Sequence, residues 1–185
     1  SRPVRMPLGA LLGASAVSQV GSQLTVVALP WFVLESTGSA AKAGLAGAAI
    51  LASRLVFGFA SGPLVDRFSY RTASVAADGI GAVGIALVPF LHRLTGLPFW
   101  QLLLAVCLSA AGDLPGLSAR RAMLPALARL AHTRIERANG AFEGLEYLGL
   151  ILGAPLAGVL IAGLGASNVL WIDAATFAGA ALAVA

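Results

Sequence analysis

Three ionisable residues stand inside long apolar stretches of this 185-residue chain: Arg54, Asp78 and Asp173. An ionisable side chain within a membrane span is costly, so it normally faces a cavity or a partner of opposite charge. Arg54 precedes Asp66 by twelve residues, about 18 Å along a helix at 1.5 Å per residue. This depth leaves Arg54 two roles: a cavity cation for an anionic or carboxylate-bearing substrate, or the counter-ion of Asp78 or Asp173.

The two acids each have two possible roles. Asp78 has no arginine three residues later, since position 81 is glycine. A buried acid without a partner favours its protonated form, which suits a proton-coupled site, whereas the alternative is a hydrogen bond between packed helices. Asp173 follows Trp171 closely, so it is either a cavity site or an interfacial acid beside an aromatic anchor.

Enzyme and metal chemistry find little support in the sequence. A single cysteine gives no disulfide framework and no multi-cysteine metal site. The two histidines, His92 and His132, fall in predicted loops, where they suit neither a metal site nor an intramembrane serine protease. No tight acid cluster suits a metal-dependent phosphotransferase. We therefore expect no enzyme activity, no metal and no cofactor.

The composition identifies the medium in which these residues lie. Hydrophobic residues make up 58% of the chain and charged residues only 11%, against about 25% charged in soluble domains. Too few polar residues remain to cover a soluble core, and the mean hydropathy is +0.89. The 12 basic residues form no stripe typical of nucleic-acid binding. We expect an all-α membrane protein in contact with the lipid bilayer and no nucleic-acid partner.

Six stretches are long and apolar enough to span a membrane, which takes about 20 residues. They cover residues 7–34, 43–65, 73–91, 98–117, 140–164 and 168–185, in one bundle over residues 1–185. The connections are predicted at residues 35–39, 67–71, 92–98 and 120–139. Because the last span has no basic flank and the chain starts at Ser1, we expect the natural protein to be longer.

The basic residues predict the orientation. With the N-terminus inside, the cytoplasmic side holds nine of them: Arg2, Arg5, Arg67, Arg71, Arg120, Arg121, Arg129, Arg134 and Arg137. The outer side holds two, Lys42 and Arg93. Cytoplasmic loops of membrane proteins are enriched in lysine and arginine, so both the N- and the C-terminus are predicted to be cytoplasmic.

Acids near this cytoplasmic side complete a predicted ion-pair network. Asp113 precedes Arg120 by seven residues, on the same helix face, and Glu143 and Glu146 share a face of the fifth span. Together with Arg121 they either neutralise the inner surface statically or form a gate that opens and closes.

Small residues recur four apart in two spans, at Gly58 and Gly62 and at Gly149 and Gly153. Such spacing lets helix backbones approach closely in a membrane. The fifth span also carries Pro155 and, on a neighbouring stripe, Gly158. A proline within a helix frees a carbonyl and kinks it, so we expect this span to bend.

The stretch after the second span carries Gly62, Leu64, Asp66, Arg67 and Arg71. Their spacing resembles the loop signature of the major facilitator superfamily, G-x-L-x-D-R-x-G-R-R, at its expected place between spans two and three. The resemblance implies a gating motif here, with ion pairs across the cytoplasmic face. The alternative is an ordinary basic loop with one acid.

Further stretches resemble the macrolide-efflux and siderophore-exporter branch of this superfamily: residues 28–31, 35–39, 119–125, 137–139, 152–158 and 172–177. The resemblance implies the N-terminal six-span half of a twelve-span transporter, whose C-terminal half would be its partner. The run around Pro155 also resembles the family's antiporter signature. The fourth span lacks the arginine that many drug–proton antiporters carry at its middle.

The resemblance implies a secondary active efflux permease for small molecules, working by alternating access in a bacterial cell (inner) membrane, with a proton as a candidate coupling ion. Two alternatives stay open at this point. One is a proton-coupled uptake permease of the same fold. The other is a complete six-span channel or scaffold subunit.

Overall fold

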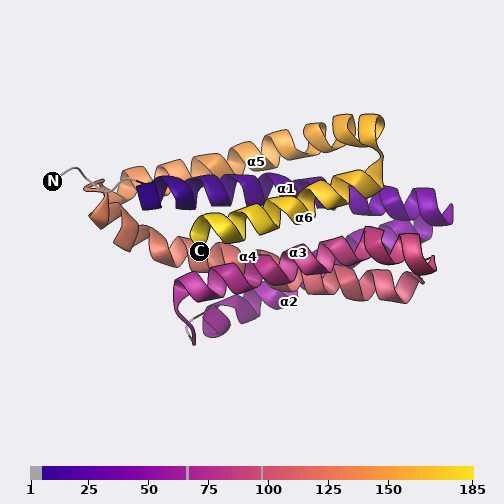
Figure 1. Cartoon of the computed structure of the whole chain (residues 1–185), viewed down its shortest axis with the longest axis horizontal. Coiled ribbons are helices and arrows are strands. Elements are labelled where there is room, and N and C mark those ends of the chain that lie inside the picture. Colours follow the sequence, from indigo (N-terminus) through magenta and orange to yellow (C-terminus); the bar gives the residue numbers. More distant parts are fainter. Residues whose placement is uncertain (1–5, 66, 97) are drawn as a thin grey trace.

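The computed structural model describes residues 6–65, 67–96 and 98–185 of the chain. The described residues form helices and short connections and contain no strand. The helices are α1 (Met6–Thr37), α2 (Ala40–Val65), α3 (Tyr70–Thr95), α4 (Phe99–Leu130), α5 (Ile135–Leu164) and α6 (Ala166–Val184). Each is long and apolar enough to cross a membrane, so the prediction of an all-α chain with six spanning helices is confirmed. The helices run roughly side by side, and α1 begins at the end of the bundle where α6 ends (Figure 1).

The prediction of a long loop over residues 120–139 is wrong. Helix α4 continues to Leu130 and α5 begins at Ile135, so the connection is short. The arginines in this stretch end the apolar run but not the helix, because alanine, leucine, methionine and arginine are all good helix formers. The charges therefore lie on helical turns and keep fixed directions.

The connection before α3 is shaped by local hydrogen bonding. Ser69 is the N-cap of α3, and its hydroxyl accepts a hydrogen bond from the backbone N–H of Thr72 at 3.2 Å. At the other end, Gly96 ends the helix with φ +75°, a left-handed conformation that favours glycine. Two small residues thus fix both ends of α3.

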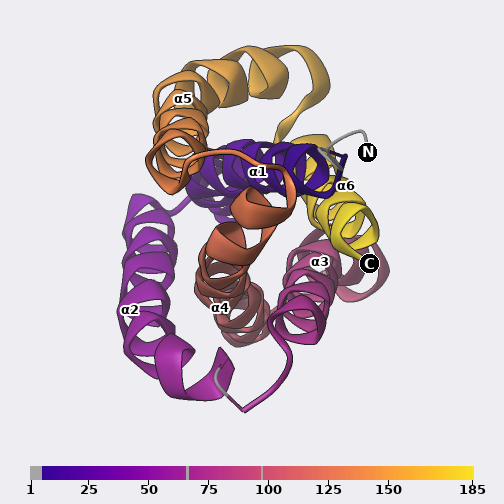
Figure 2. The same cartoon turned by 90° about the vertical axis from the view of Figure 1, so that its left-hand side faces the viewer.

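The helices are unequally buried within the bundle. Helix α3 packs mainly against α4 and α6, α1 against α5 and α6, and α2 against α4. The most apolar stretches of α1 and α4 are half buried, whereas those of α2 and α5 are each only 17% buried. Viewed along the bundle, α2 and α5 lie at its edge (Figure 2). They leave broad apolar faces outside the bundle.

Two apolar clusters form the interior. The larger one contains residues of all six helices, most of them from α1, α3, α4 and α6, and includes Phe32, Ile85, Val106 and Leu170. The smaller one lies at the end where α1 begins and includes Leu11, Leu124 and Phe142. Between these clusters lies a layer of buried and half-buried polar side chains, here called the polar layer: Ser18, Ser22, Asp78, Asp113 and Arg120.

Glycine allows the closest helix contacts. A Cβ added at Gly84 of α3 would collide with the backbone of Ser109, and one added at Gly112 of α4 would collide with the Ala77 carbonyl. Since the colliding atoms belong to the backbone, they cannot rotate away. The contact between α3 and α4 therefore depends on these two glycines.

The predicted glycine stripes are only partly used. Gly149 and Gly153 of α5 lie against Gln19 and Gln23 of α1, and Gly58 of α2 lies against Leu114. By contrast, added Cβ atoms at Gly62 and Gly158 would meet no described atom within 4 Å. Those two glycines do not mediate packing within the described part of this bundle.

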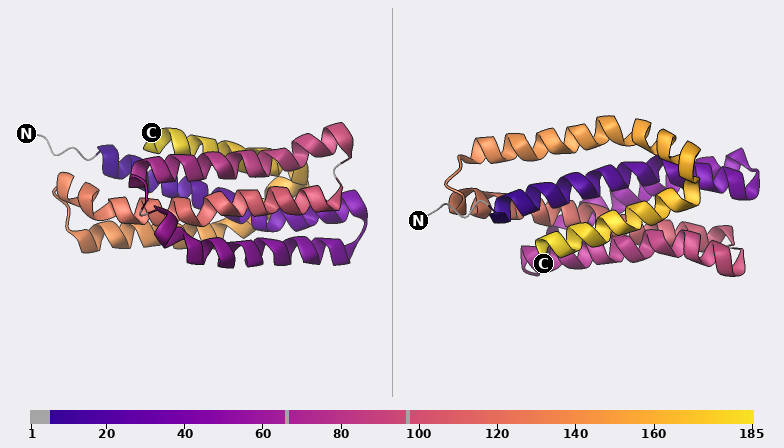
Figure 3. Two further views of the ribbon diagram at one scale, coloured as in Figure 1. Left: turned by 90° about the horizontal axis from the view of Figure 1, so that it is seen from below. Right: turned by 45° about the horizontal axis from the view of Figure 1, so that its top comes forward.

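Helix α5 continues through Pro155 as one element. Because proline has no N–H, the carbonyl of Ile151 lacks its usual helical donor. The helix is bowed where it runs along the outside of α1 (Figure 3). The bend expected at Pro155 itself stays a prediction.

We expect Gly84→Ala to lower the thermal stability of the detergent-solubilised protein. An extra methyl group at this contact costs about 1–3 kcal/mol by overpacking. Gly79→Ala is the matched control on the same helix, because its Cβ would meet no described atom within 4 Å. A melting temperature equally unaffected in both variants would show that the contact between α3 and α4 is not tight.

Candidate functional site

One ion pair of the bundle interior joins α2 to α4. Arg54 Nη2 donates to Asp113 Oδ2 at 3.0 Å, and the two side chains are 25% and 15% exposed. The hydroxyl of Ser22 on α1 donates to the other carboxylate oxygen of Asp113 at 2.8 Å. Three helices thus meet at one carboxylate, which is still accessible from outside the bundle.

The sequence suggested other partners for Arg54. Asp78 and Asp173 were the expected counter-ions, but the structure pairs Arg54 with Asp113. The reason is helix order, since α2 packs against α4 and not against α3 or α6. The cavity role of Arg54 remains open, because one quarter of its side chain is exposed.

A second ion pair is fully buried between α3 and α4. Arg120 Nη1 donates to Asp78 Oδ1 and Oδ2 at 2.8 and 2.7 Å, and its Nη2 donates to Ser18 Oγ at 3.2 Å. The side chains of Arg120 and Asp78 are 2% and 0% exposed. Arg120 and Asp78 are the most deeply buried ionisable residues of the polar layer, and each is the counter-ion of the other.

This pair corrects two expectations. Arg120 was assigned to a cytoplasmic loop and to a network with Asp113, yet it lies buried in α4 and pairs with Asp78. Asp78 was expected to lack a partner because position 81 is glycine, but its arginine comes from the neighbouring helix. A search limited to one helix could not have found this partner.

Asp173 lies fully buried on α6, which excludes the expected role of an interfacial acid. Its Oδ2 accepts a short hydrogen bond from Thr25 of α1, and its Oδ1 lies 3.0 Å from the hydroxyl of Thr176. Among the described residues, no ion pair involves Asp173. A side chain at Gly21 would overlap both Thr176 and Asp173, so glycine makes room for this acid.

A small cavity joins the two acids that are not bound by Arg120. Its polar lining comprises Ser22, Thr25, Arg54, Ser109, Asp113 and Asp173, and apolar side chains such as Ile50 and Phe177 line the rest. The cavity measures about 30 Å³, enough for one or two water molecules. Asp113 and Asp173 therefore share one polar space with a single arginine.

The remaining charges of the predicted network form a separate group. Arg121 of α4 donates to Glu146 of α5, and its guanidinium lies 5.7 Å from the ring centre of Phe142. Arg121 and Glu146 line a pocket, which Glu143 and Gln19 also line. The side chain of Arg121 is 53% exposed, so this group lies at the surface. The expected single network is thus divided into distinct groups.

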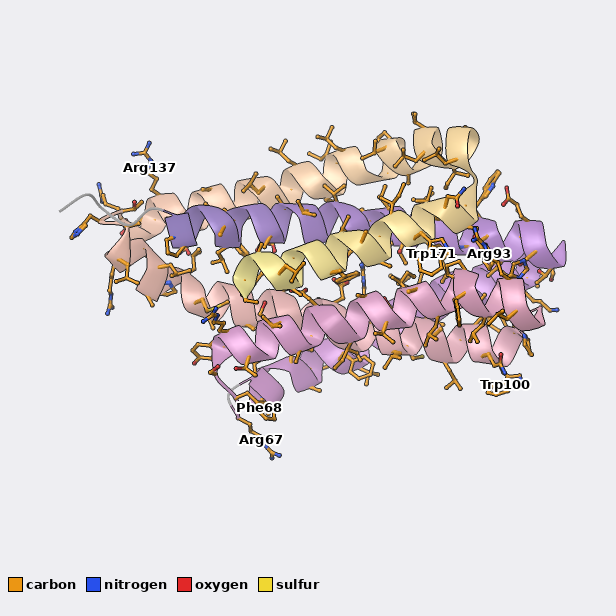
Figure 4. The ribbon with its side chains drawn as sticks, viewed as in Figure 1. Arg67, Phe68, Arg93, Trp100, Arg137 and Trp171 are labelled. Carbon is orange, nitrogen blue, oxygen red and sulfur yellow. The ribbon has the colours of Figure 1, made fainter. Side chains whose placement is uncertain are left out.

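Part of the motif after α2 lies outside the described residues, namely Asp66 and the side chain of Leu64. Arg71 Nε donates to the carbonyl of Val184 at 3.0 Å, which links the start of α3 to the end of α6. Arg67 is exposed and extends away from the bundle (Figure 4). The gating role of the motif, including Gly62, stays a prediction.

The hydroxyl groups were missed at the sequence level. Ser15, Ser18, Ser22 and Thr25 recur at intervals of three or four residues along α1, so they lie on one helix face. Three of these four hydroxyls contact a buried charged group. A stripe of small hydroxyl residues within an apolar helix was the available signal.

Comparison with known proteins places this chain in a family. Residues 11–185 match the family model described as Major Facilitator Superfamily. The multidrug efflux pump Tap of Mycolicibacterium fortuitum is 33% identical over 183 residues, covering 97% of this chain and 45% of the pump. Tap of Mycobacterium tuberculosis strain H37Rv is 34% identical, with 98% and 44% covered. Macrolide efflux protein A of Streptococcus pyogenes is 26% identical over 145 residues, with 78% and 35% covered.

The chain thus spans less than half the length of the curated relatives it matches. No solved structure matches this chain.

We expect Asp78→Asn to destabilise the protein strongly, because it leaves the Arg120 guanidinium buried without a counter-ion. Breaking a buried ion pair in this way costs about 3–5 kcal/mol. Arg134→Gln is the control, since both partners of its ion pair with Glu136 are exposed and such a pair contributes about 0–1 kcal/mol. Thermal melting in detergent measures both, and a stable Asp78→Asn protein would contradict a structural role of the pair.

Proposed function

Because this chain belongs to the Major Facilitator Superfamily, we propose that it forms one half of a secondary active transporter that exports small molecules across the bacterial cell membrane. The observation that carries the proposal is that nearly the whole chain aligns with proteins named as multidrug efflux pumps. The polar interior supports it, since ionisable groups inside a membrane bundle usually mark a substrate or ion pathway. The proposed activity is therefore transport and not catalysis of a chemical reaction.

A second six-span half is part of this proposal. The curated relatives are about twice as long as the stretch that this chain covers. Helices α2 and α5, with only 17% burial of their most apolar stretches, offer the faces against which a second half would pack. Two such halves rocking against each other around a central site would give alternating access.

The proposed orientation has both ends of the chain in the cytoplasm. Arg67 and Arg137 lie towards the end of the bundle where α1 begins, whereas Arg93 and Trp100 lie at the opposite end (Figure 4). Since basic residues concentrate on the cytoplasmic side of membrane proteins, the first end is proposed to face inward. Arg71, Arg121, Glu143 and Glu146 would then lie near the cytoplasmic mouth.

These charges are suited to a gate at that mouth. Arg121 and Glu146 join α4 to α5 at a partly exposed position, so a movement of α5 could break their ion pair without exposing the core. Gly149, Gly153 and Pro155 lie further along the same helix, where close packing on α1 and a missing helical hydrogen bond favour bending. Asp66 and Arg67 belong to the proposed gate by their place in the motif.

Transport by the full-length protein in membrane vesicles tests the proposal. We expect inside-out vesicles to accumulate a fluorescent drug substrate, and an imposed pH gradient to increase its accumulation if a proton is the coupling ion. Accumulation only in right-side-out vesicles would indicate uptake instead. Unselective passage of small ions without accumulation would indicate a channel.

Substitution of Arg54 tests whether the site binds substrate. A hydrogen bond between charged groups contributes about 1.5–3 kcal/mol, so Arg54→Ala should weaken competition by anionic compounds about tenfold or more. Cationic competitors should be unaffected or improved, and Arg54→Lys should recover part of the loss. The measurement is a competition panel in vesicles.

The control for folding is the double variant Arg54→Ala/Asp113→Asn, which removes both charges of the pair. If the double variant restores folded yield but competition by every compound is unchanged, Arg54 stabilises the bundle and does not contact substrate.

A further inference from the structure

The buried and half-buried ionisable groups of the bundle interior do not balance in charge. Asp78, Asp113 and Asp173 face two arginines, Arg54 and Arg120, and each arginine is bound to one of the first two acids. Asp173 is fully buried and binds only hydroxyl groups. An ionised carboxylate without a counter-ion is very costly in a medium of low dielectric constant. The interior therefore requires one additional positive charge.

Hydrogen-bond counting shows where this charge lies. The Thr176 hydroxyl lies 2.7 Å from the backbone carbonyl of Asp173 and 3.0 Å from its Oδ1. A hydroxyl group has one proton to donate but can also accept. If Thr176 donates along the shorter contact, to a carbonyl that cannot donate, its oxygen is left to accept from Oδ1. The Oδ1 atom can donate only if it carries a proton.

The second carboxyl oxygen agrees with this assignment. Thr25 donates to Oδ2, which leaves Oδ1 as the place of the proton. A neutral carboxylic acid thus fits both contacts of the Asp173 carboxyl group, with Oδ1–H donating to Thr176 and Oδ2 accepting from Thr25. An ionised carboxylate would leave Oδ1 with only the Thr176 hydroxyl at 3.0 Å as a donor, and the single proton of that hydroxyl has the backbone carbonyl at 2.7 Å as a closer acceptor.

We propose that Asp173 is an occluded proton-binding site, and that loss of its proton draws Arg54 away from Asp113 across the cavity that they share. On deprotonation the Oδ1–H bond breaks, the electron pair stays on the oxygen and the proton passes to water in the cavity. The new carboxylate then competes with Asp113 for the only arginine that lines this cavity. Arg54 would alternate between α4 and α6.

The other surroundings of Asp173 do not compete for this role. Helix α1 contributes only hydroxyl groups at this level, from Ser22 and Thr25. Residues 148–164 of α5, the half that leads into α6, contain no titratable side chain. Asp78 of α3 and Arg120 of α4 are bound to each other, which leaves Arg54 and Asp113 as the charged groups that respond.

This inference rests on the proposed function for its place in a transport cycle, but the proton itself can be observed without transport. Infrared spectroscopy of the full-length protein at neutral pH should show the C=O stretching band of a buried carboxylic acid. Asp173→Asn should remove this band, and Thr176→Val should shift it, because the acid loses its acceptor. Thr176→Ser should keep it in place. A band that survives Asp173→Asn, or no such band in the wild type, would overturn the assignment.

Stability gives an independent measurement. Asparagine resembles the neutral acid, so Asp173→Asn should keep the melting temperature within about 3 °C of the wild type. Asp78→Asn, which removes a truly ionised acid, should lower it by more than about 6 °C. Equal losses in the two variants would show that Asp173 is ionised and structural.

Transport then tests the coupling. With Asp173→Asn, the drug accumulation that a pH gradient drives in the wild type should be lost, while exchange of drug down its own gradient continues. Retained pH-driven accumulation, or accumulation driven by a sodium gradient instead, would overturn the coupling role. If the wild type shows no transport while the infrared band depends on Asp173, the proposed function fails and the proton site stands.

Discussion

The cost of a charge inside a membrane is the constraint on which this bundle depends. Helix α4 meets it by carrying both signs, with Asp113 directed to α2 and Arg120 directed to α3. Each charge finds its counter-ion on a different neighbour, so α4 is held from two sides and stands between them (Figure 2). The close contact at Gly84 and Gly112 brings α3 near enough for the buried pair to form. Packing and electrostatics thus require the same helix arrangement.

The two ion pairs differ in burial and in hydrogen bonding, so they suit different roles. The pair of Asp78 and Arg120 is almost fully buried, with one guanidinium nitrogen binding both carboxylate oxygens, and breaking it would leave a buried charge without its counter-ion. The pair of Arg54 and Asp113 has a single hydrogen bond, partial exposure and a small polar cavity beside it. Such a pair can be broken at low cost because water or a substrate can replace the lost partner. The first pair suits a fixed support and the second an adaptable site.

The helices can be predicted from the sequence, but which helices pack against each other cannot. The length of apolar stretches predicts six spans because a helix must satisfy its own backbone in lipid. The predicted span limits were wrong over residues 120–139, where the charged residues lie on helical turns of α4 and α5 and do not mark the end of a helix. The pairs of Arg54 and Arg120 could not be predicted, since a counter-ion on another helix depends on which helices are neighbours. The hydroxyl stripe of α1 was visible as a pattern, but its partners also come from the fold.

Hydroxyl groups of helix α1 bind three ionisable side chains of the bundle interior, on α4 and α6. Ser18 accepts from Arg120, and Ser22 and Thr25 donate to Asp113 and Asp173. The opposite contact of α1 is with Gly149 and Gly153 of α5, where Gln19 and Gln23 fit against the glycine backbone. Since α5 is largely exposed, a force applied to it from outside the bundle reaches α1 through this tight contact. A shift of α1 by a fraction of its 5.4 Å pitch would disturb three hydrogen bonds at once. Helix α1 is therefore the element through which the surface and the interior ionisable groups can influence each other.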